Sequence, residues 1–242
     1  MTSPNIDRPG GEVTKRELHF IWIADCSGSM GINGKIQALN EAIRESIPHM
    51  IEAKEENQQA EVLVRAVSFS DVAEWHVQVP TPVKQFRWED LELGGGTNMG
   101  EAIHLVAQEM QMPPMPKLSL PPVLVLISDG LPNDENDFDQ NLQYLMSQPW
   151  GLKAVRLAIP IGDDCDLDVL RKFIGNSEIE PIPAKNAEQL KAQIKFFSTV
   201  AIKAVSNPPS MQKGQSSAQV FVPSHLVAAN NQAGVLGVDD VF

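Results

Sequence analysis

Residues 18–30 read Leu18-His19-Phe20-Ile21-Trp22-Ile23-Ala24-Asp25-Cys26-Ser27-Gly28-Ser29-Met30. The first seven are apolar at nearly every position, which is typical of a parallel β-strand covered on both faces. A tight turn follows, in which one carboxylate and two hydroxyls stand at alternate positions, on Asp25, Ser27 and Ser29. Oxygen ligands of this kind suit a small hard dication such as Mg²⁺ and make a poor site for zinc or copper. The stretch therefore predicts a buried strand that ends at a site for a divalent cation.

Two later segments carry further oxygen ligands for the same site. Residues 94–98 are a glycine-rich loop that contains Thr97, and residues 123–130 are another buried strand that ends in Asp129 and a glycine. In an open parallel sheet, ligands bind in the crevice beyond the carboxyl ends of the strands. We expect the two buried strands to be neighbours, roughly 5 Å apart. Three loops that are distant in sequence then meet at one point.

Each of these side chains has an expected role at the ion. Ser27 and Ser29 can place hydroxyl oxygens directly on it, while Asp25 holds a metal-bound water and accepts hydrogen bonds from the serine hydroxyls. Thr97 and Asp129 fill further positions, directly or through water. Mg²⁺ prefers six oxygens, so these side chains leave at least one position for water or an outside ligand. Because much of the inner shell is neutral hydroxyl, the ion keeps strong positive character and attracts a carboxylate.

The order Asp-x-Ser-x-Ser, then a Thr, then an Asp at a strand end resembles the metal-ion-dependent adhesion site of the von Willebrand factor A domain family. The resemblance covers about residues 18 to 204. Cys26 stands where many relatives carry Thr, and its side chain should point away from the ion. The resemblance implies that an Asp or Glu of a partner protein completes the coordination sphere. All five family positions are filled, by Asp25, Ser27, Ser29, Thr97 and Asp129.

Within that family, the chain is most similar to the short intracellular bacterial branch of TerY-like tellurium-resistance proteins. This resemblance implies a non-catalytic adaptor that works with other stress-response proteins, sometimes alongside a protein kinase and a phosphatase. The stretches that carry it are residues 20–30, residues 67–70 (Val67-Ser68-Phe69-Ser70) and residues 128–134 (Ser128-Asp129-Gly130-Leu131-Pro132-Asn133-Asp134).

Buried strands alternate with amphipathic helices along the chain. This alternation predicts an α/β fold with a doubly wound, mostly parallel sheet and helices on both faces. Strand 72–79 follows strand 61–69 after two residues, too few for a crossover, so the pair should form an antiparallel hairpin with 72–79 at the sheet edge. The other expected strands are 18–24, 123–127, 153–159 and a short one near 180–183. The expected helices are 35–52, 99–110, 134–146, 166–174 and 187–205.

Three helices carry a further prediction about their geometry. Pro48 should kink or break the helix 35–52 near residues 46–47, because proline removes a backbone donor. Asn98 is an expected N-cap for the second helix, and Asn133 or Asp134 for the third. The acidic residues 133–139 and 162–168 fit either helix capping with a solvated face or a second cation site, and we favour capping.

Composition limits the partners and the compartment. The 242 residues carry 19 basic and 31 acidic side chains, a net charge of −12, which argues against nucleic acid and against an anionic membrane surface. Residues 1–16 look like a flexible leader, residues 17–205 form the domain that holds the metal site, and residues 206–242 look disordered. No secretory or membrane-spanning segment is evident, so we expect a cytoplasmic protein.

Two other functions fit a magnesium site. A Mg²⁺-dependent phosphoester hydrolase is disfavoured because the chain has no P-loop, no Asp-x-Asp after the first strand and no evident base or phosphate clamp. A scaffold whose partners contact helices or the edge hairpin would leave the metal purely structural. Mn²⁺ or Ca²⁺ in place of Mg²⁺ is compatible with the same ligands.

Two minor features are open to more than one interpretation. Cys26 and Cys165 both follow expected strands, and two unrelated reduced thiols are the simpler interpretation in a reducing compartment. A redox-sensitive Cys26 beside the metal is the alternative. In the tail, Asp239 and Asp240 stand among apolar residues. They are either part of a solvated, disordered segment or an internal carboxylate source for the metal.

Overall fold

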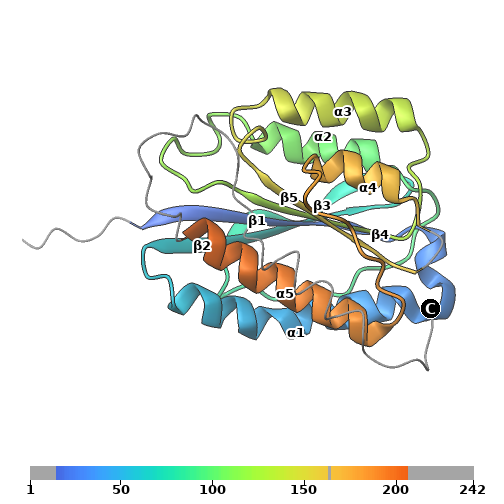
Figure 1. Cartoon of the computed structure of the whole chain (residues 1–242), viewed down its shortest axis with the longest axis horizontal. Helices are drawn as coiled ribbons and strands as arrows, with labels where there is room; N and C mark the ends of the chain where they lie inside the picture. The colour runs from blue at the N-terminus through green and yellow to red at the C-terminus, as the bar shows by residue number, and fades with distance from the viewer. Residues whose placement is uncertain (1–14, 163–164, 207–242) are drawn as a thin grey trace, which may run out of the picture.

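A computed structural model describes residues 15–162 and 165–206 of the chain, so nearly all of the expected leader and tail, including Asp239 and Asp240, lies outside the described residues. One twisted sheet lies between two layers of helices (Figure 1). In chain order the elements are β1 (Arg16–Asp25), the 3₁₀ segment η1 (Gly28–Gly34), α1 (Lys35–Glu55), β2 (Ala60–Phe69), β3 (Ala73–Pro82), α2 (Met99–Glu109), β4 (Val123–Ser128), α3 (Glu135–Ser147), β5 (Val155–Pro160), α4 (Leu167–Ile174) and α5 (Ala187–Ser206).

The sheet has five strands in the order β3-β2-β1-β4-β5. β1 is central and runs parallel to β2 on one side and to β4 on the other. β5 continues the sheet parallel to β4, whereas β3 pairs antiparallel to β2 and forms the edge. The predicted doubly wound, mostly parallel sheet with an antiparallel edge strand is therefore confirmed. The carboxyl ends of β1 and β4 lie side by side, as the metal site requires.

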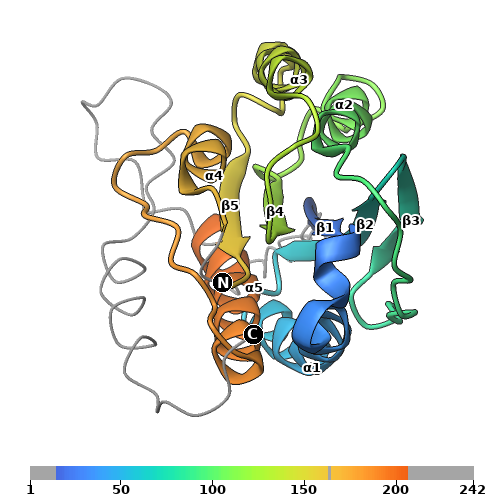
Figure 2. The same ribbon diagram turned by 90° about the vertical axis from the view of Figure 1, so that its right-hand side faces the viewer.

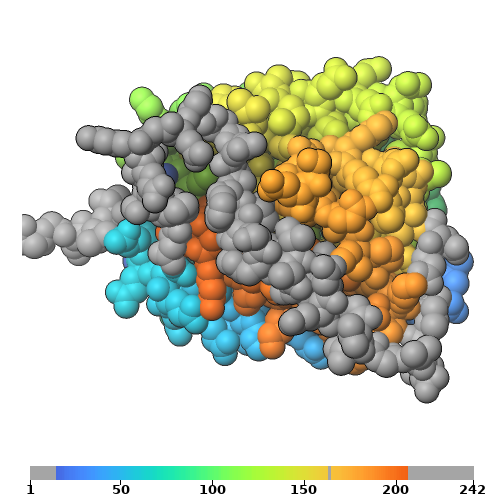
Figure 3. All heavy atoms as spheres, in the orientation of Figure 1, coloured from blue at the N-terminus to red at the C-terminus, as the bar shows by residue number. Residues whose placement is uncertain are grey.

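Both faces of the sheet are covered, which explains why β1 is apolar at nearly every position. Figure 2 shows α1 and α5 on one face and α2, α3 and α4 on the other. Phe20 and Trp22 of β1 belong to the core under α1 and α5, while Ile21 and Ile23 belong to the core under the other helices. In the space-filling view, α3 and α4 form the upper part of one face and α1 the lower part (Figure 3).

The break predicted at Pro48 does not form, because α1 continues through it to Glu55. Pro48 and Arg44 are exposed, so water can bind the carbonyl of Arg44 that loses its helical partner. Buried side chains on either side, Ile43 and Met50, hold both halves of the helix against the core. Tertiary packing therefore overrides the local cost of the proline.

A second prediction also fails, because no strand forms at 180–183. The segment makes a single bridge to the sheet, between Ile161 and Ala184. Pro181 and Pro183 have no N–H to donate to a ladder, which explains why pairing goes no further. The other expected elements form within a few residues of their predicted limits.

Acidic residues cap two helices, as expected. Asp134 accepts hydrogen bonds from the first-turn amides of α3, and Asp166 does the same for α4. Asn98 does not cap α2 in this way, because its side-chain amide donates to Glu101 instead. Among the described residues no group of three or more His, Cys, Asp or Glu side chains could hold a metal. Asp163 and Asp164 of the second acidic stretch lie outside those residues.

None of the helices in the described part of the chain is long and apolar enough to cross a bilayer.

Candidate metal centre

Two of the predicted ligands lie where neighbouring strands end. Asp25 is the last residue of β1, and Asp129 directly follows the last residue of β4. The parallel pairing of β1 with β4 extends to Ala24 and Ile127, so both carboxylates leave the sheet at the same edge. Both residues are buried. The topology therefore brings together two acidic residues that are far apart in sequence.

The serine hydroxyls join these carboxylates into one connected group of oxygens. Ser27 Oγ lies 3.0 Å from Ser29 Oγ, and Ser29 Oγ donates to Asp129 Oδ1 at 2.7 Å. Neighbouring oxygens of an octahedral Mg²⁺ ion, each at 2.0–2.1 Å from the metal, are roughly 2.9 Å apart. Both separations match those between adjacent coordination positions, although without a metal they are hydrogen bonds. This oxygen-only donor set and its spacing fit a magnesium ion.

Asp25 is the most buried member of the group, with no exposed surface. Its Oδ1 accepts from the backbone N–H of Ser27 at 2.8 Å, and its Oδ2 accepts from the hydroxyl of Ser128 at 2.6 Å. Burial raises the pKa of Asp25; hydrogen bonds from Ser128 and Ser27 oppose the rise, and the charge of Asp129 adds to it. A divalent cation nearby would favour the charged carboxylate. The expected bond from Ser29 to Asp25 does not form, because that hydroxyl donates to Asp129.

The glycine-rich loop is fastened to the turn that carries the serines. Gly28 N–H donates to the carbonyl of Gly95 at 2.9 Å, and Gly94 N–H donates to the carbonyl of Cys26 at 2.7 Å. A Cβ at Gly94 would lie 2.2 Å from Ser70 Oγ and 2.4 Å from Ser70 Cβ, so a side chain there would push the glycine-rich loop away from the turn between β2 and β3. Glycine is therefore required for this loop to lie against Ser70.

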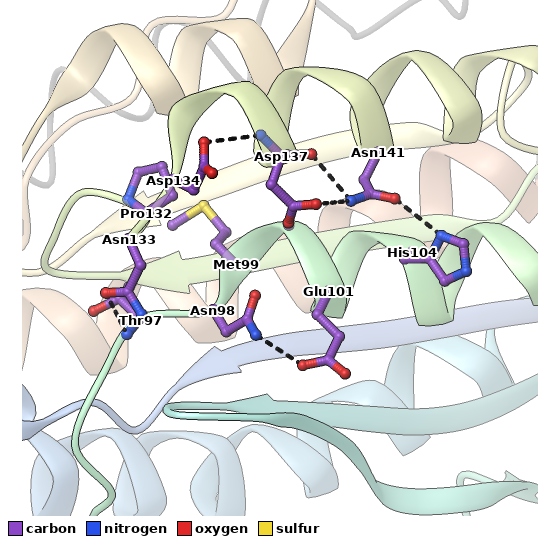
Figure 4. A pocket seen from close by; sticks show the side chains of 11 residues that line it. Thr97, Asn98, Met99, Glu101, His104, Pro132, Asn133, Asp134, Asp137 and Asn141 are labelled. Carbon is purple, nitrogen blue, oxygen red and sulfur yellow. Dashed lines mark hydrogen bonds between the residues drawn. The ribbon is translucent and has the colours of Figure 1, made fainter.

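Thr97 is held in place by the loop that follows Asp129. Its N–H donates to Asn133 Oδ1 at 3.0 Å, and Asn133 N–H donates to the carbonyl of Thr97 at 2.9 Å. Figure 4 shows the two residues together at one end of a cavity of about 640 Å³, with His104 and Asn141 at the other end. Both bonds use the main chain of Thr97, so the role of its hydroxyl as a ligand stays a prediction.

Three polar residues of this region were missed in the sequence. Ser128 donates to Asp25, and Asp71 accepts from the amides of the glycine loop at Gly95 and Gly96. Lys35 Nζ donates to Asp129 Oδ2 at 2.7 Å, and the Lys35 side chain is 12% exposed. A lysine as the first residue of α1 opposes the helix dipole. In the sequence, this unfavourable position of Lys35 was the one indication that its ammonium group pairs with a residue outside the helix.

Lys35→Met is expected to tighten Mg²⁺ binding about tenfold, because the ammonium group holds one oxygen of Asp129 and repels a dication. Without metal the same change should lower the thermal unfolding temperature, because it leaves a buried carboxylate without its counter-ion. Isothermal titration with MgCl₂ and thermal unfolding in EDTA measure the two effects. Lys35→Arg keeps the charge and serves as the control. Weaker Mg²⁺ binding by Lys35→Met would contradict this role.

The cysteines agree with the simpler of their two interpretations. Among the described residues no disulfide forms, and Cys26 and Cys165 are both thiols. Burial raises the pKa of the Cys26 thiol to about 11, and its Sγ donates to the carbonyl of Phe69. The reactive form of a cysteine is the thiolate. These properties disfavour a redox-sensitive Cys26.

No protein-family model matches this chain, and no curated protein matches it in sequence.

Solved structures are similar to it in fold. The von Willebrand factor type A protein from Catenulispora acidiphila has a TM-score of 0.59 at 19% identity, over 78% of this chain and 43% of that one. The ArnB paralog VWA2 from Sulfolobus acidocaldarius has a TM-score of 0.55 at 17% identity, over 75% of this chain and 45% of that one. Proximal thread matrix protein 1 from the mussel byssus, solved with a zinc-occupied MIDAS motif, has a TM-score of 0.55 at 13% identity, over 78% and 46%.

These structures define the class of protein by its fold. The chain has the von Willebrand factor A fold, and it spans less than half the length of each of the three proteins. Its similarity to the TerY-like branch rests on the sequence stretches given above and stays a prediction.

Proposed function

We propose that this chain is a non-catalytic protein-binding module that works through a bound divalent cation. Asp25, Ser27, Ser29, Thr97 and Asp129 would hold the ion, directly or through water. The ion would supply a positive charge at the surface, to which a partner protein offers an Asp or Glu carboxylate. Mg²⁺ is the proposed metal, with Mn²⁺ or Ca²⁺ as substitutes that the same oxygen ligands accept.

One observation carries this proposal: the row of oxygens from Ser27 through Ser29 to Asp129, with separations of 3.0 and 2.7 Å. Two of the three are neutral hydroxyls, which compensate little of the charge of a dication. Ser29 is exposed although its neighbours Asp25 and Ser27 are buried. The group is therefore open to an outside ligand on the side of Ser29.

A similar metal motif occurs in one of the proteins of the same fold. The mussel byssus protein was solved with zinc in its MIDAS motif. By analogy, the equivalent edge of this sheet is the place where we propose a metal. For this chain we propose magnesium rather than zinc, because the ligand set contains no nitrogen or sulfur.

The wider role rests on sequence resemblance alone. We propose an adaptor in a bacterial stress response of the tellurium-resistance kind, located in the cytoplasm and working with a kinase and phosphatase pair. Nucleic acid and membranes are not among the proposed partners, because the net charge of −12 would repel both.

Partner capture from a native extract tests the function, with the full chain as bait and mass spectrometry to identify the captured proteins. We expect at least one partner to bind in Mg²⁺ and to be lost both in EDTA and with Ser29→Ala. Ser177→Ala, an exposed serine between α4 and α5, is the matched control and should retain it. Changing the responsible Asp or Glu of that partner to Asn or Gln should also abolish binding.

Other outcomes would replace the proposal. A partner retained equally in EDTA and by Ser29→Ala would mean that any metal here is structural. Hydrolysis of generic phosphoesters by the purified chain in Mg²⁺, lost on Asp25→Ala, would make it a hydrolase instead.

A further inference from the structure

Exposed apolar side chains gather on the loops that surround the candidate metal centre. Each of the three loops with predicted ligands carries one: Ile32 is 57% exposed, Leu93 48% and Leu131 48%. Val72, in the adjoining turn between β2 and β3, is 60% exposed. We call these four residues the apolar rim. Single exposed apolar residues are ordinary, but a group around one polar site marks an interaction surface.

The rim residues are placed beside the ligands by the same contacts that form the site. Ile32 lies in η1, three residues after Ser29, and Leu131 lies two residues after Asp129. Leu93 directly precedes the glycine loop, and its Cδ1 would lie 3.0 Å from a Cβ at Gly31, so it packs over η1. The loops of Ile32, Val72 and Leu131 leave the sheet at its carboxyl edge, where β1, β2 and β4 end. The loop of Leu93 comes from the other end of β3 and is held at this edge by the hydrogen bonds of Gly94 and Gly95 to the turn after β1.

The apolar rim is not part of a general scatter of such residues. Four other large apolar side chains of the described residues are exposed. Val79 lies on the outer strand β3, Met112 follows the far end of α2, and Leu118 and Leu152 precede β4 and β5. Leu118 also lies beside the first residue of β1, because its carbonyl accepts from Arg16. Leu118 and Leu152, at the amino-terminal ends of the parallel strands, are therefore matched control positions.

The negative charge of the chain limits how acidic its partner can be. With a net charge of −12, the chain repels a strongly acidic partner at a distance. Asp71 and Asp134 are exposed close to the site and would repel further carboxylates at short range. A partner segment with a single carboxylate is repelled much less than one with several. Apolar neighbours of that carboxylate would add affinity by covering the apolar rim.

We infer that the partner segment carries one isolated Asp or Glu flanked by large apolar side chains, rather than a run of acidic residues. This inference rests on the proposed function, because the isolated carboxylate meets the bound cation. The flanking side chains cover the apolar rim, including Ile32 and Leu131. The metal provides recognition of the charge, and the apolar rim selects among the many proteins that display an acidic residue.

Selection from a displayed library of random peptides tests the inference with the full chain in millimolar Mg²⁺. We expect the enriched peptides to contain a single Asp or Glu with Leu, Ile, Met or Phe beside it, and to elute in EDTA. Their binding should weaken about tenfold with Ile32→Ser or Leu131→Ser, and further in the double variant. Leu118→Ser and Leu152→Ser, on the opposite edge, should change it less than twofold. Thermal unfolding of each variant checks that the fold is intact.

Two contrary results can be told apart. The enriched peptides could bind in a Mg²⁺-dependent way but carry no apolar residues beside the carboxylate, or they could bind the rim variants as tightly as the wild type. Either result would overturn the inferred role of the apolar rim and leave the proposed function standing. Peptides that bind equally in EDTA, or no peptide above background, would overturn both.

Discussion

Asp25→Asn is expected to weaken Mg²⁺ binding about a hundredfold and to raise the thermal unfolding temperature measured without metal. The amide has the shape of the carboxylate and still accepts from Ser27 N–H, while the Ser128 hydroxyl can turn to accept from the amide. The charge is lost, which removes roughly 2.7 kcal/mol of attraction for a dication. Without metal, the same loss relieves the repulsion between two buried carboxylates, Asp25 and Asp129. Each kcal/mol relieved corresponds to about 2–4 °C.

The pH dependence of stability gives this prediction a second readout. Because burial raises the pKa of Asp25, the folded chain holds that proton more tightly than the unfolded chain. Without metal, the free energy of unfolding of the wild type should therefore fall as the pH rises from 3.8, the ordinary pKa of an aspartate, through the raised pKa of Asp25. Above that raised pKa it should stay low. Asp25→Asn lacks this loss. The stabilities of the two proteins should converge at low pH and separate at neutral pH.

Isothermal titration with MgCl₂ and thermal unfolding in EDTA over a pH series measure both parts. Asp90→Asn is the control, because Asp90 is exposed and pairs with Arg44 away from the site. It should keep wild-type Mg²⁺ affinity within twofold. Unchanged Mg²⁺ affinity in Asp25→Asn would refute the assignment of this carboxylate to the metal centre.

Trp22→Ala should cost about 4 kcal/mol of unfolding free energy, the largest stability effect that we expect from one substitution. Trp22 has no exposed surface and lies in the middle of β1, beside Ala66 of β2 and Val125 of β4. Its ring meets Phe20 edge-on, with the centroids 4.8 Å apart. Removing it would open a cavity under the strand that presents Asp25. Urea unfolding followed by circular dichroism measures the loss.

Trp22→Phe is the matched comparison and should cost only about 1–2 kcal/mol. Within the described part of the chain, the indole Nε1 has no hydrogen-bond partner, so phenylalanine forfeits packing volume but no hydrogen bond. If phenylalanine were as costly as alanine, a polar partner of the indole would have to be present after all.

The parts of the fold that could be predicted are those whose signal is local. A strand buried on both faces must be apolar at consecutive positions, so β1 and β4 were evident in the sequence. The connection between β2 and β3, three residues long, is too short for a crossover and allows only an antiparallel hairpin. Asp134 and Asp166 cap their helices because each needs only the amides of the next turn.

Two of the failed predictions depend on contacts between distant segments, whereas the strand at 180–183 fails because of its own prolines. Pro48 is tolerated because Ile43 and Met50 anchor α1 against residues of other elements. Asn98 donates to Glu101 in the first turn of its own helix, and Glu101 is held there because it also accepts from the backbone of Ala73. The sequence around α2 does not contain the bond from Ala73.

For the site, the amino-acid sequence alone determined which oxygen-bearing side chains stand at the ends of two buried strands, because strand ends and turns leave a pattern over a few residues. Only the tertiary structure decided how those groups pair: Ser29 with Asp129 rather than with Asp25, Ser128 with Asp25, and Lys35 with Asp129. It also decided that Ile32, Leu93 and Leu131 remain exposed around them. The physical reason is that hydrogen bonds and burial form between atoms close in space, and the pairing of β1 with β4 sets those distances.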